Sequence, residues 1–356
     1  MIPPGGTIGI LGGGQLGRML AQAAQALGYR VHIFCSDQDA PATQVTAHAT
    51  LAAYDDEAAL ARFADAVDVV TFEFENVPAP SAAILAARRP VHPRPAILEI
   101  CQDRLREKDF LRSIDVPVTG YRAVTGAAAL RSAMKEVGPR AILKTSRWGY
   151  DGKGQIALDG KSEIDAAWRE IGSTASILEA RVDFALEISV IVARGADGAE
   201  ASYVPVENRH ANHILDVTIA PAKIDGALAA RAEIMARRIA AKLELIGLVA
   251  VEMFVTKSGQ LLVNELAPRP HNSGHWTLDA CVTSQFEQLV RAVCGLPLGS
   301  TERHSNAVMK NLIGADVAKW RETLDDPKAK LHLYGKTSAP PGRKMGHVTT
   351  LSPRTD

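Results

Sequence analysis

The sequence predicts a protein of mixed α/β and α+β class with an N-terminal parallel-sheet domain, a larger central domain and a small C-terminal domain. Short apolar runs alternate with helical patterns over the first 98 residues, which is typical of βαβ units. A proline-marked segment, HPRPA at 92–96, then interrupts this alternation. The remaining chain combines a long Ala-rich helical pattern with apolar runs that predict hairpins. A chain of 356 residues is long enough for two or three domains.

The N-terminal segment predicts strands joined by at least one helix in its first half. An apolar run such as TIGIL, bounded by glycines, favours a strand, and the spacing of Leu16, Met19 and Leu20 places three apolar side chains on one helix face. We therefore expect strands at 7–11, 30–34 and 68–74 and a helix at 15–27.

The rest of the chain is read in the same way. We expect helices at 103–114, 225–245 and 285–294, strands at 140–146, 176–180 and 184–195, a hairpin at 248–265, and short strands with polar loops in 301–356. The predicted domains are 1–98, 99–300 and 301–356.

Composition excludes several broad classes of function. The chain has 40 basic and 40 acidic residues and no net charge, so neither a nucleic-acid partner nor an acidic tail is expected. The N-terminus has no Lys or Arg ahead of its apolar residues, and no run of 18 apolar residues occurs, so we expect neither a signal peptide nor a membrane span. The four scattered cysteines fit reduced thiols of a cytoplasmic protein.

Three glycines near the N-terminus match a dinucleotide-binding pattern. Gly12, Gly14 and Gly17 follow a predicted strand and open a predicted helix, and Asp37 comes twenty residues after the last of them. This pattern is compatible with an NAD enzyme. Because a helix N-terminus binds anions in general, the turn indicates a ligand-facing site more strongly than it indicates NAD.

A second glycine-rich loop follows the predicted strand that ends near Lys144. The segment SRWGYDGKGQ, at 146–155, combines three glycines with Lys153. Flexible backbone N–H groups and a lysine suit a triphosphate. The spacing does not match a Walker A motif, and a hairpin tip with a solvated lysine is the alternative.

Two glutamates face each other in the predicted hairpin. If 258–259 form a two-residue turn, Lys257 pairs with Gln260, and Glu252 lies directly opposite Glu265. Opposed like charges destabilise a sheet, so we expect either a raised pKa on one carboxyl or a cation between the two. Two carboxylates suit Mg²⁺; two exposed glutamates on a solvated face are the alternative.

The segment that follows Glu265 is unusually rich in polar chemistry. NELAPRPHNSGHWT, at 264–277, carries one carboxylate, one arginine, two histidines and two asparagines within fourteen residues. An ordinary strand-to-helix loop needs only one or two turn-forming residues. This density predicts that the loop contacts a substrate.

These segments together match one known family. They are GGGQLGRM (12–19), DR (103–104), GYDGKGQ (149–155), VEMF (251–254), NELAPRPHNSGHWT (264–277), NLIG (311–314) and GRKMGHV (342–348). From about residue 7 to about residue 349 the chain resembles the N5-carboxyaminoimidazole ribonucleotide synthetases, carboxylating ligases of purine biosynthesis in the ATP-grasp superfamily. The longest motifs are specific; the glycine motif alone is not. Trp148 departs from the pattern, because a small residue is expected there.

The resemblance implies a Rossmann-like N-terminal domain that does not bind NAD. It also implies an ATP-grasp domain that follows, with two α+β subdomains joined by a hinge near 179–183. ATP would bind between these two subdomains. Glu179–Val182 would face adenine, Glu187 would hold the ribose, and Lys144 and the 149–155 loop would cover the phosphates. Glu252 and Glu265 would hold Mg²⁺. The implied ATP contacts are Arg104, Lys144, Gly149, Tyr150, Asp151, Gly152, Lys153, Gly154, Gln155, Glu179, Ala180, Arg181, Val182, Glu187, His210, Asn264 and Glu265.

The resemblance also implies a second site for 5-aminoimidazole ribonucleotide and bicarbonate. The implied catalytic residues are Arg269, His271, Asn272, Lys153 and Tyr150, and the implied acceptor-binding residues are Gln15, Glu73, Lys336 and Arg343, the last two facing the 5′-phosphate. Bicarbonate would attack the γ-phosphate to form carboxyphosphate, which the exocyclic amine would capture as a carbamate. Glu73 and His271 are both possible general bases. A cytoplasmic homodimer is also implied.

Other functions remain open on the sequence. A different ATP-grasp ligase would share the ATP-binding half and differ in its acceptor residues. An NAD(P)-dependent oxidoreductase would use the first domain but leaves the opposed glutamates without a role. A catalytically inactive nucleotide-binding protein is the last alternative, although Lys144, Glu252 and Glu265 are all present.

Overall fold

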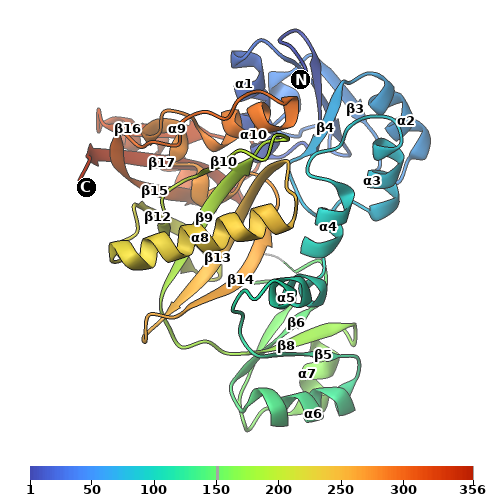
Figure 1. Cartoon of the computed structure of the whole chain (residues 1–356), viewed down its shortest axis with the longest axis vertical. Helices are drawn as coiled ribbons and strands as arrows, with labels where there is room; N and C mark the ends of the chain where they lie inside the picture. Colours follow the sequence, from blue (N-terminus) through green and yellow to red (C-terminus); the bar gives the residue numbers. More distant parts are fainter. Residues whose placement is uncertain (150–151, 356) are drawn as a thin grey trace.

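The computed structural model describes residues 1–149 and 152–355 and arranges them around three β-sheets with helices against their faces (Figure 1). This mixed α/β architecture confirms the predicted fold class. Among the described residues, no helix has both the length and the apolar character that crossing a membrane requires.

The N-terminal sheet is parallel and has the strand order β3-β2-β1-β4. The expected strands and first helix are confirmed. The last residues of the HPRPA segment do not form a linker but begin helix α4, since proline fits the first turn of a helix. The elements are β1 (Thr7–Leu11), α1 (Gln15–Ala26), β2 (Arg30–Cys35), η1 (Thr43–Val45), β3 (His48–Leu51), α2 (Glu57–Asp65), β4 (Val69–Phe72), α3 (Ala79–Ala86) and α4 (Pro95–Cys101).

A smaller antiparallel sheet with the order β5-β8-β6-β7 forms a separate lobe at the lower end of Figure 1. Helix α5 leads into it, capped by the side chain of Asp103, which accepts hydrogen bonds from two backbone N–H groups. The elements are α5 (Arg104–Ser113), β5 (Tyr121–Val124), α6 (Ala127–Val137), β6 (Ala141–Thr145), β7 (Gln155–Leu158), α7 (Ile164–Glu170) and β8 (Ser176–Ala180).

The largest sheet has nine strands in the order β14-β13-β9-β11-β12-β15-β17-β16, with β10 paired to β9. Its first half comprises β9 (Phe184–Arg194), β10 (Glu200–Ser202), β11 (Val206–Ala211), β12 (Ile214–Ala220), α8 (Gly226–Lys242), β13 (Gly247–Thr256) and β14 (Leu261–Ala267). Its second half comprises η2 (Asn272–Gly274), α9 (Thr277–Ala280), α10 (Gln285–Cys294), β15 (Ser305–Ile313), η3 (Gly314–Lys319), α11 (Trp320–Leu324), β16 (Ala329–Leu333) and β17 (Lys344–Pro353).

The C-terminal strands are longer than the short strands that the sequence suggested. β15 has nine residues and β17 has ten, because both pair along most of their length in the middle of the large sheet. These strands therefore extend a sheet that begins in the central part of the chain. The division of the chain at residues 98 and 300 stays a prediction.

Both faces of the large sheet are covered at β9 and β13, which explains the nearly continuous apolar sequence of these two strands. Val190 and Val192 of β9 pack in a core beneath helix α8, while Ile191 and Ala193 point to the opposite core, which also contains α1 and α10. Alternate side chains of one strand thereby join two cores. The N-terminal sheet and the large sheet share the second of these cores through α1.

Candidate functional site

A cavity of about 710 Å³ lies where residues of the three sheets converge. Most of the residues that sequence reasoning proposed line it, from segments that are far apart in the chain. They are Gln15, Glu73, Arg104, Lys144, Gly149, Gly152, Lys153, Gln155, Glu179, Ala180, Arg181, Val182, Glu187, His210, Glu252, Asn264, Glu265, Arg269, His271 and Asn272.

Three proposed residues that the structure describes are not among those that line this cavity. Gly154, Lys336 and Arg343 lie outside its lining. Tyr150 and Asp151 lie outside the residues that the structure describes.

The opposed glutamates are paired as expected, but the turn that was used to derive the pairing is wrong. Thr256 and Gln260 close a three-residue loop in which Gly259 has a φ of +75°. That loop alone would place Glu252 opposite Asn264. A bulge between Glu252 and Met253 shifts the register by one residue and brings Glu252 opposite Glu265.

Each of the two carboxylates contacts a basic side chain of the protein. Arg104 Nη1 lies 3.0 Å from Glu265 Oε2, and His271 Nε2 lies 3.0 Å from Glu252 Oε1. Burial favours the neutral acid, but the charges of Arg104 and Lys144 outweigh it and lower the pKa of Glu265 to about 2. Of the two expected alternatives, a raised pKa therefore does not apply to Glu265.

Arg104 links the glutamate pair to the glycine-rich loop. Besides its contact with Glu265, it donates from Nη2 to the carbonyl of Gly149 at 3.1 Å. The neighbouring Asp103 accepts hydrogen bonds from Ser146 Oγ at 2.9 Å and from Arg147 Nε at 3.2 Å. The Asp103–Arg104 pair thus fixes the start of the loop relative to the carboxylates.

The glycine-rich loop approaches the large sheet at Gly152. This residue has a φ of +79°, and a Cβ atom there would lie 2.5 Å from Cβ of His213, in the turn between β11 and β12. Only glycine fits both the backbone conformation and the close approach. The loop therefore spans from the small sheet to the large one, as a cover for bound phosphates would.

Trp148 precedes this loop in an unusual conformation. Its φ is +67°, a region that bulky residues rarely adopt, and its side chain is 62% exposed at the edge of the cavity. A large residue is thus tolerated at this position because the indole ring of Trp148 points to solvent and is not packed in the core.

Lys144 and Glu179 form an ion pair in the small sheet. A second lysine, Lys108, is 1% exposed and lies 3.5 Å from the other oxygen of Glu179. Burial opposes ionisation of Glu179, but the charges of Lys108 and Lys144 lower its pKa to about 2. The carboxylate of Glu179 is therefore paired with these two lysines, and the residue also lines the cavity.

Glu187 and His210 lie on the adjacent strands β9 and β11 and form a short hydrogen bond between Oε2 and Nδ1. Burial disfavours the imidazolium, yet the Glu187 carboxylate raises the pKa of His210 above its ordinary value. The two side chains provide a polar edge to the cavity of the kind that binds hydroxyl groups.

The N-terminal glycine turn holds a carboxylate. Glu73, at the end of β4, accepts hydrogen bonds from the backbone N–H groups of Gly14 at 2.6 Å and Gly17 at 2.8 Å. A Cβ on Gly14 would lie 2.6 Å from Glu73 Oε1, so the glycine permits this contact. Burial raises the pKa of Glu73, although the backbone hydrogen bonds and nearby cations oppose this effect.

The proposed acceptor residues form a second charged group beside Glu73. Arg269 pairs with Glu75 across 194 positions of sequence. Lys336 donates to the carbonyl of Lys344 at 2.6 Å, and burial together with the Arg343 charge lowers the pKa of Lys336 to about 8. The Arg343 guanidinium donates to Ser338 Oγ at 2.8 Å.

Sequence reasoning missed several residues of this site. Lys344 and the buried Glu107 both line the cavity, and Glu107 accepts a hydrogen bond from the backbone N–H of Leu266 at 2.9 Å. Burial raises the pKa of Glu107 to about 8. The sequence signal was available for Lys344, which is adjacent to Arg343 in a specific motif, but charged residues within helix α5 resemble an ordinary solvated face.

Three family models match consecutive parts of the chain. They are a ribonucleotide synthetase preATP-grasp domain over residues 6–102, an ATP-grasp domain over 109–286 and a phosphoribosylaminoimidazole carboxylase C-terminal domain over 307–356.

Similar proteins match over nearly the whole chain. The N5-carboxyaminoimidazole ribonucleotide synthase of Brucella melitensis is 49% identical, with 99% of this chain and 98% of the relative covered. The bifunctional purine synthesis protein purC/E of Dictyostelium discoideum is 47% identical over 98% of this chain, which spans 37% of that longer protein.

Solved structures agree with this likeness. An ADP complex of an N5-carboxyaminoimidazole ribonucleotide synthetase superimposes with a TM-score of 0.96 at 42% identity, covering 99% of this chain and 94% of the other. An Aspergillus clavatus N5-carboxyaminoimidazole synthase in complex with ADP and 5-aminoimidazole ribonucleotide gives a TM-score of 0.91 at 30% identity, covering 98% and 94%.

Proposed function

The chain belongs to the N5-carboxyaminoimidazole ribonucleotide synthase family, and from this premise we propose how its residues carry out the reaction. The protein is an ATP-grasp ligase of purine biosynthesis that carboxylates 5-aminoimidazole ribonucleotide at the expense of ATP. We propose bicarbonate as the carbon source and carboxyphosphate as the intermediate. One observation supports this assignment of residues. The same cavity is lined by Lys144, by the Glu252–Glu265 pair and by the polar loop after β14.

ATP binds between the small and large sheets in this proposal. The backbone of Glu179–Val182 faces adenine, and Glu187 with His210 receives the ribose hydroxyls. Lys144, Lys153 and the N–H groups of the 149–155 loop surround the phosphates, with Arg104 joining the loop to Glu265. The remaining residues assigned to ATP stay predictions of the same kind: Gly149, Tyr150, Asp151, Gly152, Gly154, Gln155 and Asn264.

The donor set of Glu252 and Glu265 fits Mg²⁺. Two carboxylates on adjacent strands line one cavity, and the low pKa of Glu265 keeps that residue charged throughout the neutral range. Arg104 already offsets the charge of Glu265, and His271 contacts Glu252, so the fit rests on the donor chemistry and not on repulsion alone. When bound, the cation would neutralise charge that develops on the transferring phosphoryl group.

The acceptor binds on the side of the cavity that faces the N-terminal domain. Gln15 and Glu73 line it there, and Arg269, His271 and Asn272 approach from the loop after β14. Of the two candidate bases, Glu73 is the better, because burial raises its pKa towards the range in which a carboxylate accepts a proton. His271 is instead held by Glu252. Lys336 and Arg343 supply positive charge for the 5′-phosphate.

The proposed reaction has two steps. An oxygen of bicarbonate attacks the γ-phosphorus of ATP while the bond to the β-phosphate oxygen breaks, giving ADP and carboxyphosphate. The exocyclic amine then bonds to the carboxyl carbon, phosphate leaves, and the amine proton passes to the base. The loop over the phosphates excludes water from carboxyphosphate, which water would hydrolyse.

An assay of ADP release tests this assignment most directly. With ATP, Mg²⁺ and bicarbonate, we expect slow ADP formation that rises strongly when 5-aminoimidazole ribonucleotide is added, together with incorporation of labelled bicarbonate into the acceptor. Equal stimulation by an unrelated amine or carboxylate would instead point to another ATP-grasp ligase. The cytoplasmic location and the homodimer stay predictions, to be checked by fractionation and by sedimentation.

A further inference from the structure

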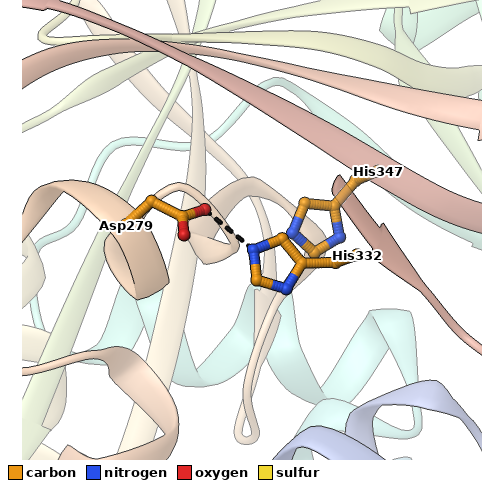
Figure 2. Close-up of side chains that lie close together, drawn as sticks. All are labelled: Asp279, His332 and His347. Atoms are coloured by element: carbon orange, nitrogen blue, oxygen red, sulfur yellow. Dashed lines mark hydrogen bonds and ion pairs between the residues drawn. The ribbon is translucent and has the colours of Figure 1, made fainter. Parts of the chain in front are cut away.

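A cluster of two histidines and an aspartate lies in the C-terminal part of the large sheet, formed by residues with no part in the reaction proposed above. His332 of β16 and His347 of β17 are paired directly across the antiparallel ladder, so their side chains share one face. Asp279 of α9 reaches the same place, with Oδ2 2.9 Å from His332 Nε2 (Figure 2).

The two imidazole rings point their Nε2 atoms in the same direction. The rings stack with centroids 4.5 Å apart and planes inclined by 16°. In Figure 2 both Nε2 atoms face the side on which Asp279 lies. One donor atom from each of the three residues falls within 4.8 Å of the other two.

His347 leaves one ring nitrogen unsatisfied. The residue is fully buried, and its Nδ1 is 2.8 Å from the hydroxyl oxygen of Tyr334, but its Nε2 has no hydrogen-bond partner among the described residues. Buried polar atoms without a partner are rare in folded proteins, because the lost hydration is not replaced. When Nδ1–H donates to Tyr334, Nε2 carries a bare lone pair directed into the cluster.

We propose that Asp279, His332 and His347 form a binding site for a zinc-type divalent cation. Two imidazole nitrogens and one carboxylate oxygen suit Zn²⁺, whereas Mg²⁺ prefers oxygen ligands only. The contact between Tyr334 and His347 Nδ1 is the kind of outer contact that orients metal-binding histidines. Bonds of ~2.0–2.1 Å place tetrahedral ligand atoms about 3.3 Å apart. His332 Nε2 and Asp279 Oδ2, which are 2.9 Å apart, must therefore separate slightly, while ligand atoms up to 4.8 Å apart must approach. His332, whose side chain is 30% exposed, has room to rotate.

A cation here would hold α9 against the edge of the C-terminal sheet. Helix α9 directly follows the loop that lines the cavity, and His275 connects the two places. His275 stacks on His347 with centroids 4.7 Å apart and contacts Asn272 Oδ1 through Nε2 at 3.0 Å. The site is therefore a structural one that supports the position of Asn272, separate from the carboxylates proposed for Mg²⁺.

Zinc binding to the chelator-treated full-length protein tests the proposal. Binding is measured by competition with a chromogenic chelator in excess Mg²⁺, which occupies the Glu252–Glu265 pair. We expect one tightly bound Zn²⁺ per chain in the wild type. Asp279→Asn and His332→Asn should each weaken binding at least a hundredfold, and Tyr334→Phe about tenfold to a hundredfold, the range for lost outer contacts.

Matched controls locate the ion and exclude loss of the fold. Two control variants should retain the zinc. They are His304→Asn, which changes an exposed histidine in the same part of the chain, and Glu265→Gln. Without metal, His332→Asn should melt as the wild type does, while Zn²⁺ should raise the melting temperature of the wild type only. Co²⁺ should give visible absorption bands typical of imidazole ligands, absent in His332→Asn. Three results would each overturn the proposal. They are the lack of tight Zn²⁺ binding by the wild type, wild-type Zn²⁺ affinity in both His332→Asn and Asp279→Asn, and loss of Zn²⁺ binding in Glu265→Gln.

Discussion

The carboxylate of Glu73 accepts a hydrogen bond of 2.6 Å from the backbone N–H of Gly14, fifty-nine positions earlier in the chain. Its other oxygen accepts from the N–H of Gly17. The N-terminus of α1, where dinucleotide-binding proteins hold a pyrophosphate, is therefore occupied by an acidic side chain of the protein itself.

We expect no binding of NADH for this reason. A pyrophosphate would have to displace Glu73 and would meet its charge. Titration of the protein with NADH, followed by cofactor fluorescence, should show no saturation in the low micromolar range. Saturable binding that ATP does not displace would contradict this expectation.

Glu265→Gln should nearly abolish ADP formation. Loss of one carboxylate from the proposed metal pair removes several kcal/mol of transition-state stabilisation. The measurement is ADP release at saturating Mg²⁺, with Glu136→Gln, a surface glutamate paired with Arg122, as the control. Wild-type turnover by Glu265→Gln would remove the pair from the metal site.

The same substitution should also lower stability without metal. The folded pKa of Glu265, about 2, lies below its unfolded value, so the ionised carboxylate contributes stability above pH ~4.5 that is lost as pH falls towards 2. Glu265→Gln lacks this contribution at neutral pH. Its thermal unfolding should occur below that of the wild type at pH 7, and the gap should narrow in acid.

Binding of the acceptor should weaken as pH rises above about 8. The pKa of Lys336 is about 8, so its ammonium group loses its charge above that pH, whereas a bound phosphate favours the charged form. The KM for aminoimidazole ribonucleotide should therefore rise from pH 7.5 to pH 9.5. Lys336→Arg stays charged over this range and should flatten the profile. An identical pH dependence in wild type and variant would exclude this role for Lys336.

Arg343→Ala should weaken the ribonucleotide about tenfold to a hundredfold, since a charge-assisted hydrogen bond contributes roughly 1.5–3 kcal/mol. The KM for ATP should change little, and the riboside without phosphate should lose far less. Arg321→Ala, an exposed arginine of α11, is the control. An equal loss for nucleotide and riboside would show that Arg343 instead holds its own loop through Ser338.

Gly152→Ala should raise the KM for ATP about tenfold. A Cβ there would lie 2.5 Å from His213, and the left-handed backbone costs an L-residue roughly 1–2 kcal/mol. Gly172→Ala is the matched control, because Gly172 also has a positive φ, of +84°, but no atom of the residues that the structure describes lies within 4 Å of its added Cβ. If both substitutions raised the KM for ATP equally, backbone strain alone would explain the weaker binding of ATP.

The sequence by itself predicted a part of the elements and named many of the residues that line the cavity. Periodicity predicted β1, α1, α5, β9 and α8 because each depends on which neighbouring residues are apolar. Contiguous motifs named residues that do line one cavity. The prediction that Glu252 pairs with Glu265 assumed a turn of two residues, whereas the loop has three. The pairing is still correct, because a bulge that was not predicted shifts the register by one residue.

Only the tertiary structure decided which distant groups meet. Glu73 fills the glycine turn, Lys108 is buried beside Glu179, and Gln44 Nε2 donates to the carbonyl of Gly335 at 2.7 Å across 291 positions. His332 and His347 meet because β16 and β17 pair in one register, and Asp279 joins them from a helix packed on that sheet. Local patterns fix conformation through steric and hydrophobic periodicity, whereas such contacts depend on how separate elements pack, and no short window of sequence contains that information.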